Sequence, residues 1–135
     1  MGKQALVYRT TETGIKPSVE TFEDYKGMQS FVDGLIERVV IPFNVNSTDY
    51  DVYVNEEGMF LDNPPSMVLY FEGKVHNVIK GNFFISKVDD EGESVSLTDD
   101  EIMAVREYIA RNTHSFKYKD ENDKEISRKL FVAHY

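Results

Sequence analysis

Short apolar runs separated by polar turns recur along this chain, a pattern that is typical of a domain built mainly from strands. Two such runs lie within residues 51–85 and are rich in β-favouring residues, so we expect them to form the central strands of one small sheet. The pattern predicts strands at residues 4–9, 17–22, 35–41, 50–54 and 76–88. It does not decide whether residues 67–71 form a strand or a helical turn.

Proline and glycine positions refine these strands. Pro17 lacks a backbone donor, so the strand that it begins is expected at a sheet edge. Gly58 is expected to supply positive φ to a turn after the fourth strand, with residues 59–61 returning toward the core. Gly81, inside the longest predicted strand, predicts a bulge or a close approach by another backbone or a ligand.

A first helix is predicted from apolar residues at three- and four-residue spacing. Glu23 and Asp24 place negative charge where this helix begins, which suits its dipole, and Gly34 is expected to end it. Its apolar face comprises Tyr25, Met28, Phe31, Val32 and Leu35.

A second helix is predicted from Thr98 to about Asn112. Thr98 and Glu101 have the spacing of a capping box, in which the two residues satisfy each other's backbone donors. Its apolar face comprises Ile102, Val105 and Ile109. After this helix, residues 114–119 and 126–135 are expected to pair as a hairpin.

These elements predict the α+β fold class, with a mainly antiparallel β-sheet, two packed helices and a C-terminal β-hairpin. The 135 residues suit one domain, with residues 1–112 as its core and residues 113–135 as a hairpin extension of it. Because the hairpin shows little apolar core of its own, we expect it to pair with another subunit, which predicts a homo-oligomer.

Charge narrows the class of partner. The net charge is -9, and residues 49–101 hold 13 acidic and three basic residues. An extended nucleic acid is not an expected partner, because binding along a phosphate backbone needs a basic stripe. Two interpretations of the acidity stay open: it keeps the protein soluble, or it mimics a nucleic acid and docks on a basic partner.

The chain has no cysteine, which excludes disulfides, thiolate zinc sites and cysteine nucleophiles. The first apolar run is too short for a signal peptide, and no segment reaches the roughly 20 apolar residues that span a membrane. We therefore expect a cytoplasmic location and no membrane partner.

No catalytic or metal-binding pattern emerges from the polar residues. The three histidines share no ligand spacing, and residues 89–93 lack the spacing of a calcium loop. Glu56, Glu57 and Asp62 offer carboxylates without a paired nucleophile or base, so a solvated turn is the simpler interpretation. We expect no enzyme activity, no metal and no cofactor.

A binding role has more support. Phe83 and Phe84 are adjacent on a predicted strand and therefore face opposite sides. One of them is expected in the core, and the other, beside Asn82 and Gly81, is a candidate stacking platform for a base. Burial of that second ring under a helix is the alternative interpretation.

Late basic residues are candidates for a pocket that takes a small phosphate-bearing ligand, because Arg forks match phosphate geometry. They lie on the second predicted helix and on the hairpin, where a solvated basic face is the alternative interpretation. The bases concerned are Arg106, Arg111, Lys117, Lys119, Arg128 and Lys129. The predicted ligand-binding residues are Asn82, Phe83, Phe84, Arg106, Arg111, Lys117 and Arg128.

The order of these segments resembles a small family of bacteriophages and mobile elements that is catalogued as domain of unknown function 3846. The similarity covers about residues 4–112, and the basic hairpin after Asn112 falls outside it. The segments that carry it are Val52-Tyr53-Val54-Asn55-Glu56-Glu57-Gly58, Asn63-Pro64-Pro65, Ile79-Lys80-Gly81-Asn82-Phe83-Phe84-Ile85 and Ser96-Leu97-Thr98-Asp99-Asp100-Glu101.

The resemblance implies a phage or mobile-element origin and hence the cytoplasm of a host; it carries no active site to transfer. Small acidic phage proteins without catalytic motifs are often inhibitors of host defence. In a first hypothesis, the protein is a sponge, an oligomer that sequesters a nucleotide immune signal without hydrolysing it. In a second, its acidic surface covers a basic site on a host protein. An enzyme that degrades a nucleotide is a third, weaker hypothesis.

Overall fold

The computed structural model describes residues 2–39, 41–57 and 63–134 of the chain. The first sheet is built from β1 (Lys3–Thr10), β2 (Ile15–Phe22), β3 (Ile36–Val39), β6 (Asp51–Asn55), β9 (Phe83–Val88) and β10 (Ser94–Val95). The second is built from β7 (Pro65–Phe71), β8 (Lys74–Lys80), β11 (Thr113–Lys119) and β12 (Glu125–His134). The remaining elements are α1 (Tyr25–Val32), α2 (Asp99–Arg111), and the small pair β4 (Asn44–Val45) and β5 (Thr48–Asp49).

The strand order of the first sheet is β2-β1-β9-β6-β3, with β10 beside β9, and that of the second is β11-β12-β7-β8. Neighbouring strands run antiparallel except β12 and β7, which are parallel. The predicted α+β class and the edge position of the Pro17 strand are confirmed. The expectation of a single sheet is wrong, because β7 and β8 belong to a second one.

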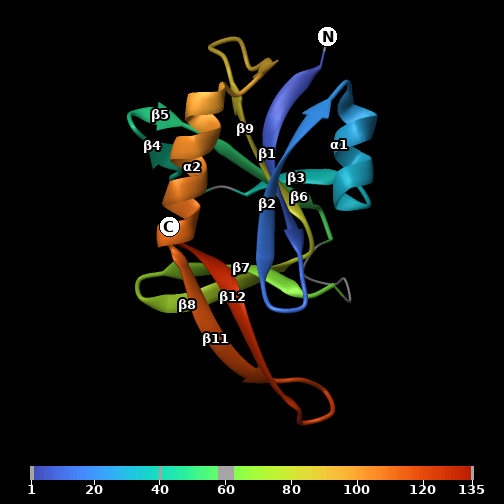
Figure 1. Ribbon diagram of the computed structural model, residues 1–135, viewed down its shortest axis with the longest axis vertical. Coiled ribbons are helices and arrows are strands. Elements are labelled where there is room, and N and C mark those ends of the chain that lie inside the picture. The colour runs from blue at the N-terminus through green and yellow to red at the C-terminus, as the bar shows by residue number, and fades with distance from the viewer. Residues whose placement is uncertain (1, 40, 58–62, 135) are drawn as a thin grey trace.

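Each face of the first sheet is covered by a different layer. Strand alternation sends Val7 and Phe84 into a small core under α1, and Tyr8 and Phe83 into a larger core on the opposite face. The second sheet and α2 close that larger core, with Phe131 of β12 among its members. Figure 1 shows α1 and α2 on opposite sides of the first sheet, with the β11–β12 hairpin extending away from them.

Local signals set both helix starts. Asp24 caps α1 by accepting a hydrogen bond from the Gly27 N–H at 3.0 Å. Thr98 and Glu101 form the predicted capping box, with reciprocal bonds of 2.9 and 3.1 Å. The end of α1 differs from the prediction: Asp33, with φ 62°, adopts the left-handed conformation in place of Gly34.

The predicted strand over residues 76–88 is wrong, because the chain changes sheets within it. Strand β8 ends at Lys80 and β9 begins at Phe83, in the other sheet. Gly81 lies between them at φ 89°, and a Cβ there would come within 3.2 Å of the Asn63 side chain. The Gly81 N–H donates to the Pro64 carbonyl at 2.9 Å, which confirms the predicted close approach of another backbone. Gly81 marks a turn between sheets and not a bulge.

The C-terminal hairpin is part of the core. Residues 130–133 are buried, and β12 pairs with β7 inside the same chain, with Phe131 opposite Met67. The expectation that the hairpin has little core is wrong, so the reason given for pairing with another subunit falls away. The predictions that concern Gly58, residues 59–61 and Asp62 lie outside the described residues.

Candidate functional site

A cleft of about 590 Å³ lies where α2, the β1–β2 hairpin and the β11–β12 hairpin meet. We call it the Arg106 cleft. It lies at the end of α2 where β11 begins, a junction visible in Figure 1. The residues that line it are Tyr8, Ile15, Pro17, Arg106, Ile109, Ala110, Thr113, His114, Ser115 and Lys129.

Helix α2 supplies one wall. Arg106, Ile109 and Ala110 lie on one helical face because they are three and four residues apart. Ile109 is buried in the larger core and so anchors this face, whereas Arg106 is exposed. The Thr113 hydroxyl donates to the Ile109 carbonyl at 2.6 Å, which joins the end of the helix to β11.

Tyr8 of β1 forms part of the inner lining. Its ring stacks on Phe83 with centroids 4.9 Å apart and an interplanar angle of 10°, and the residue is 3% exposed. Burial raises the pKa of the Tyr8 hydroxyl, and the nearby positive charge of Arg106 opposes that shift. The hydroxyl therefore stays protonated at neutral pH and can act as a neutral donor.

The two hairpins are held together at the far wall. The Lys129 N–H donates to the Thr13 carbonyl at 2.9 Å, and a Cβ on Gly14 would come within 2.6 Å of the Lys129 carbonyl oxygen. Only glycine fits at this backbone contact. Lys129 and Ser115 face each other in the β11–β12 register, so both lie on the hairpin face that the cleft uses.

The electrostatics of the cleft are opposite to those of the molecule as a whole. Arg106 and Lys129 are cations, His114 adds an imidazole, and no Asp or Glu is among the described residues that line the cleft. Within the described parts of the chain, no carboxylate lies within ion-pair distance of Arg106 or Lys129. The arrangement provides donors and positive charge and is suited to binding an anion.

Neither phenylalanine of the predicted stacking platform is available to a ligand. Phe83 and Phe84 are both 0% exposed. Phe83 stacks between Tyr8 and Phe131, and Phe84 packs against Phe22 and the ring of Tyr53. The expectation of an exposed ring is wrong, because both faces of the central strand β9 are covered.

The side chains of Asn82 and Arg128 form hydrogen bonds with backbone groups of other segments. Asn82 accepts a hydrogen bond from the Thr10 N–H at 3.0 Å, which fixes the turn before β9. The guanidinium of Arg128 is buried, 4% exposed, and donates to the carbonyls of Thr11, Glu12, Gly14 and Pro65 at 2.6 to 3.1 Å. The Asn82 carbonyl oxygen and both terminal nitrogens of Arg128 are used within the fold, and the Arg128 Nε is buried without a hydrogen-bond partner. The structure therefore argues against their predicted role as ligand contacts.

The remaining predicted bases are dispersed. Arg111 and Lys117 are exposed, and neither is among the residues that line the Arg106 cleft. Lys117 shares a hairpin face with Ser115 because the two are two residues apart on β11. Of the seven predicted site residues, Arg106 is the one that lines this cleft.

Sequence reasoning missed Tyr8, His114 and Ser115 as cleft residues. It named Lys129 among the candidate pocket bases but not among the predicted ligand-binding residues. The alternation of β11 and β12 carries a usable signal, because it places Ser115 and Lys129 on one face once their register is known. Tyr8 carries no such signal, since it comes from the opposite end of the chain.

Across the residues whose placement is described, no group of three or more His, Asp or Glu side chains is arranged to hold a metal ion. Among the described helices, none is long and apolar enough to cross a membrane.

Comparison with known proteins gives a family match. Residues 5–111, which include most of β1, all of α2 and most of the core, match the family described as "Domain of unknown function (DUF3846)". No curated protein and no solved structure gives a significant match. The matched range ends at Arg111, so the β11–β12 wall of the cleft lies outside it.

Proposed function

The chain belongs to the DUF3846 family, and we propose that it binds a small phosphate-bearing ligand of the nucleotide class in the Arg106 cleft without chemically changing it. The observation that carries this proposal is the gathering of Arg106 and Lys129, with His114, in a cleft along which the structure describes no carboxylate. In a molecule of net charge -9, such a local excess of positive charge favours an anionic ligand.

The cleft also suits the non-phosphate part of a nucleotide. Its volume of about 590 Å³ lies within the range of about 300–1,000 Å³ that is usual for small-molecule sites. Ile15 and Pro17 are half-buried and give it an apolar surface, and the buried side chains of Ile109 and Tyr8 complete the lining. A base or ribose would lie against this surface while the phosphates meet the cations.

Sequestration is the biological role that follows from binding without reaction. We propose further that the protein comes from a phage or mobile element and acts in the cytoplasm of a host. By binding a nucleotide immune signal there, it would lower the free concentration of that signal. This role needs affinity and abundance but no nucleophile. Thr113 already donates its hydroxyl to the Ile109 carbonyl, which is consistent with a binding cleft rather than a reactive one.

Isothermal titration calorimetry with cyclic dinucleotides, cyclic trinucleotides and cyclic ADP-ribose isomers tests the proposal. We expect saturable binding of at least one of them, weakened about tenfold or more by Arg106→Met, because a charge-assisted hydrogen bond is lost. Arg111→Met is the matched control: it removes an exposed arginine from the same helix, outside the cleft, and should leave affinity within about twofold. Absence of binding to all of them would reject the proposal.

Recovery of the ligand separates a sponge from an enzyme. After incubation, the protein is denatured and the released ligand is analysed by mass spectrometry. Sequestration predicts intact ligand in stoichiometric amount. A hydrolysed or isomerised product that disappears in Arg106→Met would instead establish a nucleotide-degrading enzyme.

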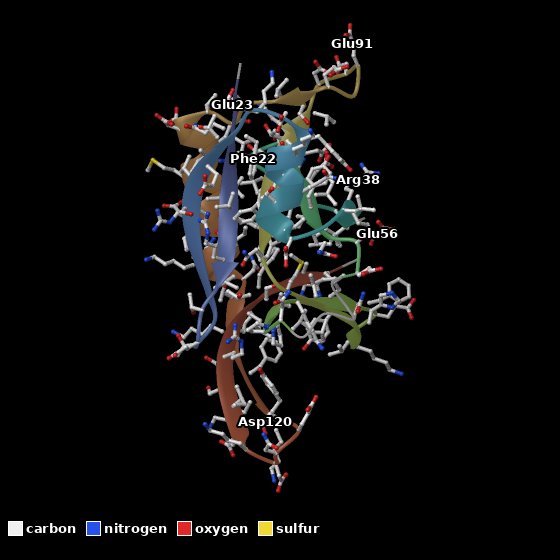
Figure 2. All side chains as sticks on the ribbon, turned by 90° about the vertical axis from the view of Figure 1, so that its right-hand side faces the viewer. Phe22, Glu23, Arg38, Glu56, Glu91 and Asp120 are labelled. Carbon is white, nitrogen blue, oxygen red and sulfur yellow. The ribbon has the colours of Figure 1, made fainter. Side chains whose placement is uncertain are left out.

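A second candidate function is binding of a basic host protein through an acidic end of the molecule. One pocket is lined by Glu23 and Asp24 at the start of α1 and by Asp89 and Glu93 of the β9–β10 turn. Lys3 is the one base among its described lining residues. Figure 2 shows Glu23 and Glu91 at the same end, opposite Asp120 at the hairpin tip. Acids that are far apart in the sequence are thus gathered on one surface.

Salt-dependent capture from host lysate tests this second candidate. A basic protein that is retained at low salt, released at high salt, and lost with Glu23→Lys and Glu93→Lys would support it. The Arg106→Met variant should retain that protein. Capture that depends on Arg106 and not on the acidic end would contradict it.

A further inference from the structure

The hydroxyl of Tyr8 is a polar group that the fold itself does not use. Tyr8 is buried, and its ring stacks on Phe83, which in turn stacks on Phe131. Among the described residues, the Tyr8 hydroxyl has no hydrogen-bond partner. A buried tyrosine hydroxyl usually has one, because the group loses water when it is buried and needs a partner in exchange.

This hydroxyl opens into the Arg106 cleft. In the described parts of the chain, Arg128 Nε is the one sealed side-chain polar atom without a partner, so the Tyr8 hydroxyl is not sealed inside the core. Tyr8 is one of the residues that line the cleft. Because the residue as a whole is 3% exposed, its ring offers no face on which a base could stack. The hydroxyl is therefore the part of Tyr8 that a ligand can meet.

Arg106 is the charged neighbour of this hydroxyl. Burial raises the pKa of the Tyr8 hydroxyl, and Arg106 is near enough for its positive charge to oppose that rise. Arg106 is exposed, and no carboxylate pairs with it within the described ranges. A neutral O–H and a guanidinium thus face the same space, and a phosphate oxygen accepts hydrogen bonds from both kinds of donor.

We propose that the Tyr8 hydroxyl and the Arg106 guanidinium hold the same phosphate group, with Tyr8 as the inner donor that fixes its position. The exposed Lys129 adds positive charge from the hairpin wall. The inference rests on the phosphate-binding part of the proposed function and names the residues that orient the phosphate. Tyr8 determines specificity in this arrangement, because an anion that brings no acceptor oxygen to the hydroxyl leaves it unpaired.

Titration with inorganic phosphate at constant ionic strength, followed by amide chemical shifts, tests the role of Tyr8. We expect saturable shifts at Tyr8 and Ile109, and an affinity about fivefold or more weaker in Tyr8→Phe, because one hydrogen bond is lost. Tyr118→Phe changes a half-buried tyrosine of β11 that does not line the cleft, and it should bind phosphate within about twofold of the parent. Equal affinity of the parent and Tyr8→Phe, or no saturable shift in the cleft, would overturn the proposal.

A double-mutant cycle shows whether the two donors hold one phosphate. If they do, Arg106→Met already misplaces the anion, so adding Tyr8→Phe should cost less affinity than Tyr8→Phe costs in the parent. Salt separates the two contributions. Tyr8→Phe removes a neutral donor and should keep the salt dependence of the parent, whereas Arg106→Met should flatten it. Independent losses in the cycle, or a slope that Tyr8→Phe flattens as much as Arg106→Met does, would contradict the shared phosphate.

Stability distinguishes a binding role of the hydroxyl from a structural one. Tyr8→Phe keeps the ring on Phe83 and removes a hydroxyl without a partner among the described residues, so the urea midpoint should stay unchanged or rise. Tyr50→Phe removes a hydroxyl that donates to Glu101 at 3.1 Å, and it should lower the midpoint. A lowered midpoint for Tyr8→Phe would place its hydroxyl in the service of the fold and overturn the proposal.

Calorimetry with the cyclic dinucleotides, cyclic trinucleotides and cyclic ADP-ribose isomers separates the failure of this inference from the failure of the proposed function. If none of them binds, but inorganic phosphate binds and Tyr8→Phe weakens it, the shared phosphate site stands and the nucleotide function falls. If one of them binds the parent and Tyr8→Phe with equal affinity, the nucleotide function stands and the role of Tyr8 falls.

Discussion

Arg128 donates from Nη2 to the carbonyl of Gly14 at 2.8 Å and so fastens the last strand to the first hairpin. The same guanidinium binds Thr11, Glu12 and Pro65 through their carbonyls. A buried cation is costly unless its donors are satisfied, and here backbone carbonyls rather than a carboxylate satisfy most of them. The contact also sets the position of the β1–β2 turn beside the Arg106 cleft.

Replacing Arg128 is expected to destabilise the protein. Arg128→Met leaves buried carbonyls without donors and should lower the free energy of unfolding by at least about 2 kcal/mol. Urea denaturation measures this loss. Arg111→Met removes an exposed arginine and should change stability by no more than about 0.5 kcal/mol. Equal effects of the two substitutions would contradict the structural role of Arg128.

Two glycines should respond to the same substitution with opposite signs. Gly14→Ala places a Cβ within 2.6 Å of a backbone oxygen of Lys129, which must move, so we expect a loss of about 1–3 kcal/mol. Gly27→Ala lies in α1, where its Cβ would meet Phe22 at an ordinary 3.5 Å, and alanine favours the helix by about 0.5–1 kcal/mol. Thermal unfolding of both variants checks the difference; a stabilised Gly14→Ala would refute the close contact.

Features with a local cause were predictable from the sequence. The capping box of Thr98 and Glu101 depends on residues three apart, and it fixed the start of α2 correctly. The change of sheet at Gly81 was not predictable, because the apolar run continues on both sides of it. What turns the chain is a long-range contact, in which the Asn82 side chain accepts from the Thr10 N–H.

The same distinction applies to the candidate site. Strand alternation correctly placed Phe83 and Phe84 on opposite faces of the sheet. The neighbouring sequence does not predict that the second sheet covers one face and α1 the other. Arg128 resembles any other base of the hairpin in sequence; its burial depends on a turn 114 residues away. Arg106 was identified because the exposure of an arginine on a helix follows from the local sequence. The position of Lys129 beside the cleft depends instead on how the two hairpins meet.

Glu101 should make stability depend on acidic pH. Burial opposes its ionisation, but hydrogen bonds from Lys87 Nζ, from the Thr98 backbone and from the Tyr50 hydroxyl together hold its pKa below the ordinary value of 4.5. A lowered carboxyl pKa contributes stability that is present above the ordinary value and is lost as pH falls through the folded-state pKa.

Glu101→Gln isolates this contribution because glutamine can still complete the capping box. In urea titrations across acidic pH, the variant should lose less stability between neutral pH and pH below 4.5 than the parent does. Glu107→Gln, an exposed change on the same helix, should reproduce the parent curve. An unchanged slope for Glu101→Gln would show that this carboxyl does not carry the dependence.

Tyr50 should make stability depend on alkaline pH. Burial and its hydrogen bond to Glu101 raise the pKa of Tyr50 to about 12 from the ordinary 10.0. Its contribution is therefore complete below pH 10.0 and is lost as pH rises toward 12, because the unfolded chain loses the proton first. Tyr50→Phe should lose less stability than the parent over this range, whereas Tyr25→Phe, an exposed change, should not differ from it.

Ionic strength should show whether Arg106 holds the phosphates of a ligand in the Arg106 cleft. Raising salt from about 0.1 M to 1 M shortens the Debye length from about 10 Å to 3 Å, which weakens attraction between exposed charges. A phosphate-bearing ligand in the Arg106 cleft should bind more weakly as salt rises, and Arg106→Met should flatten that dependence, since Arg106 is one of the two strong cations there. Calorimetric titration of the parent protein and of Arg106→Met at each salt concentration gives the two slopes. Equal slopes would mean that Arg106 does not hold the phosphates.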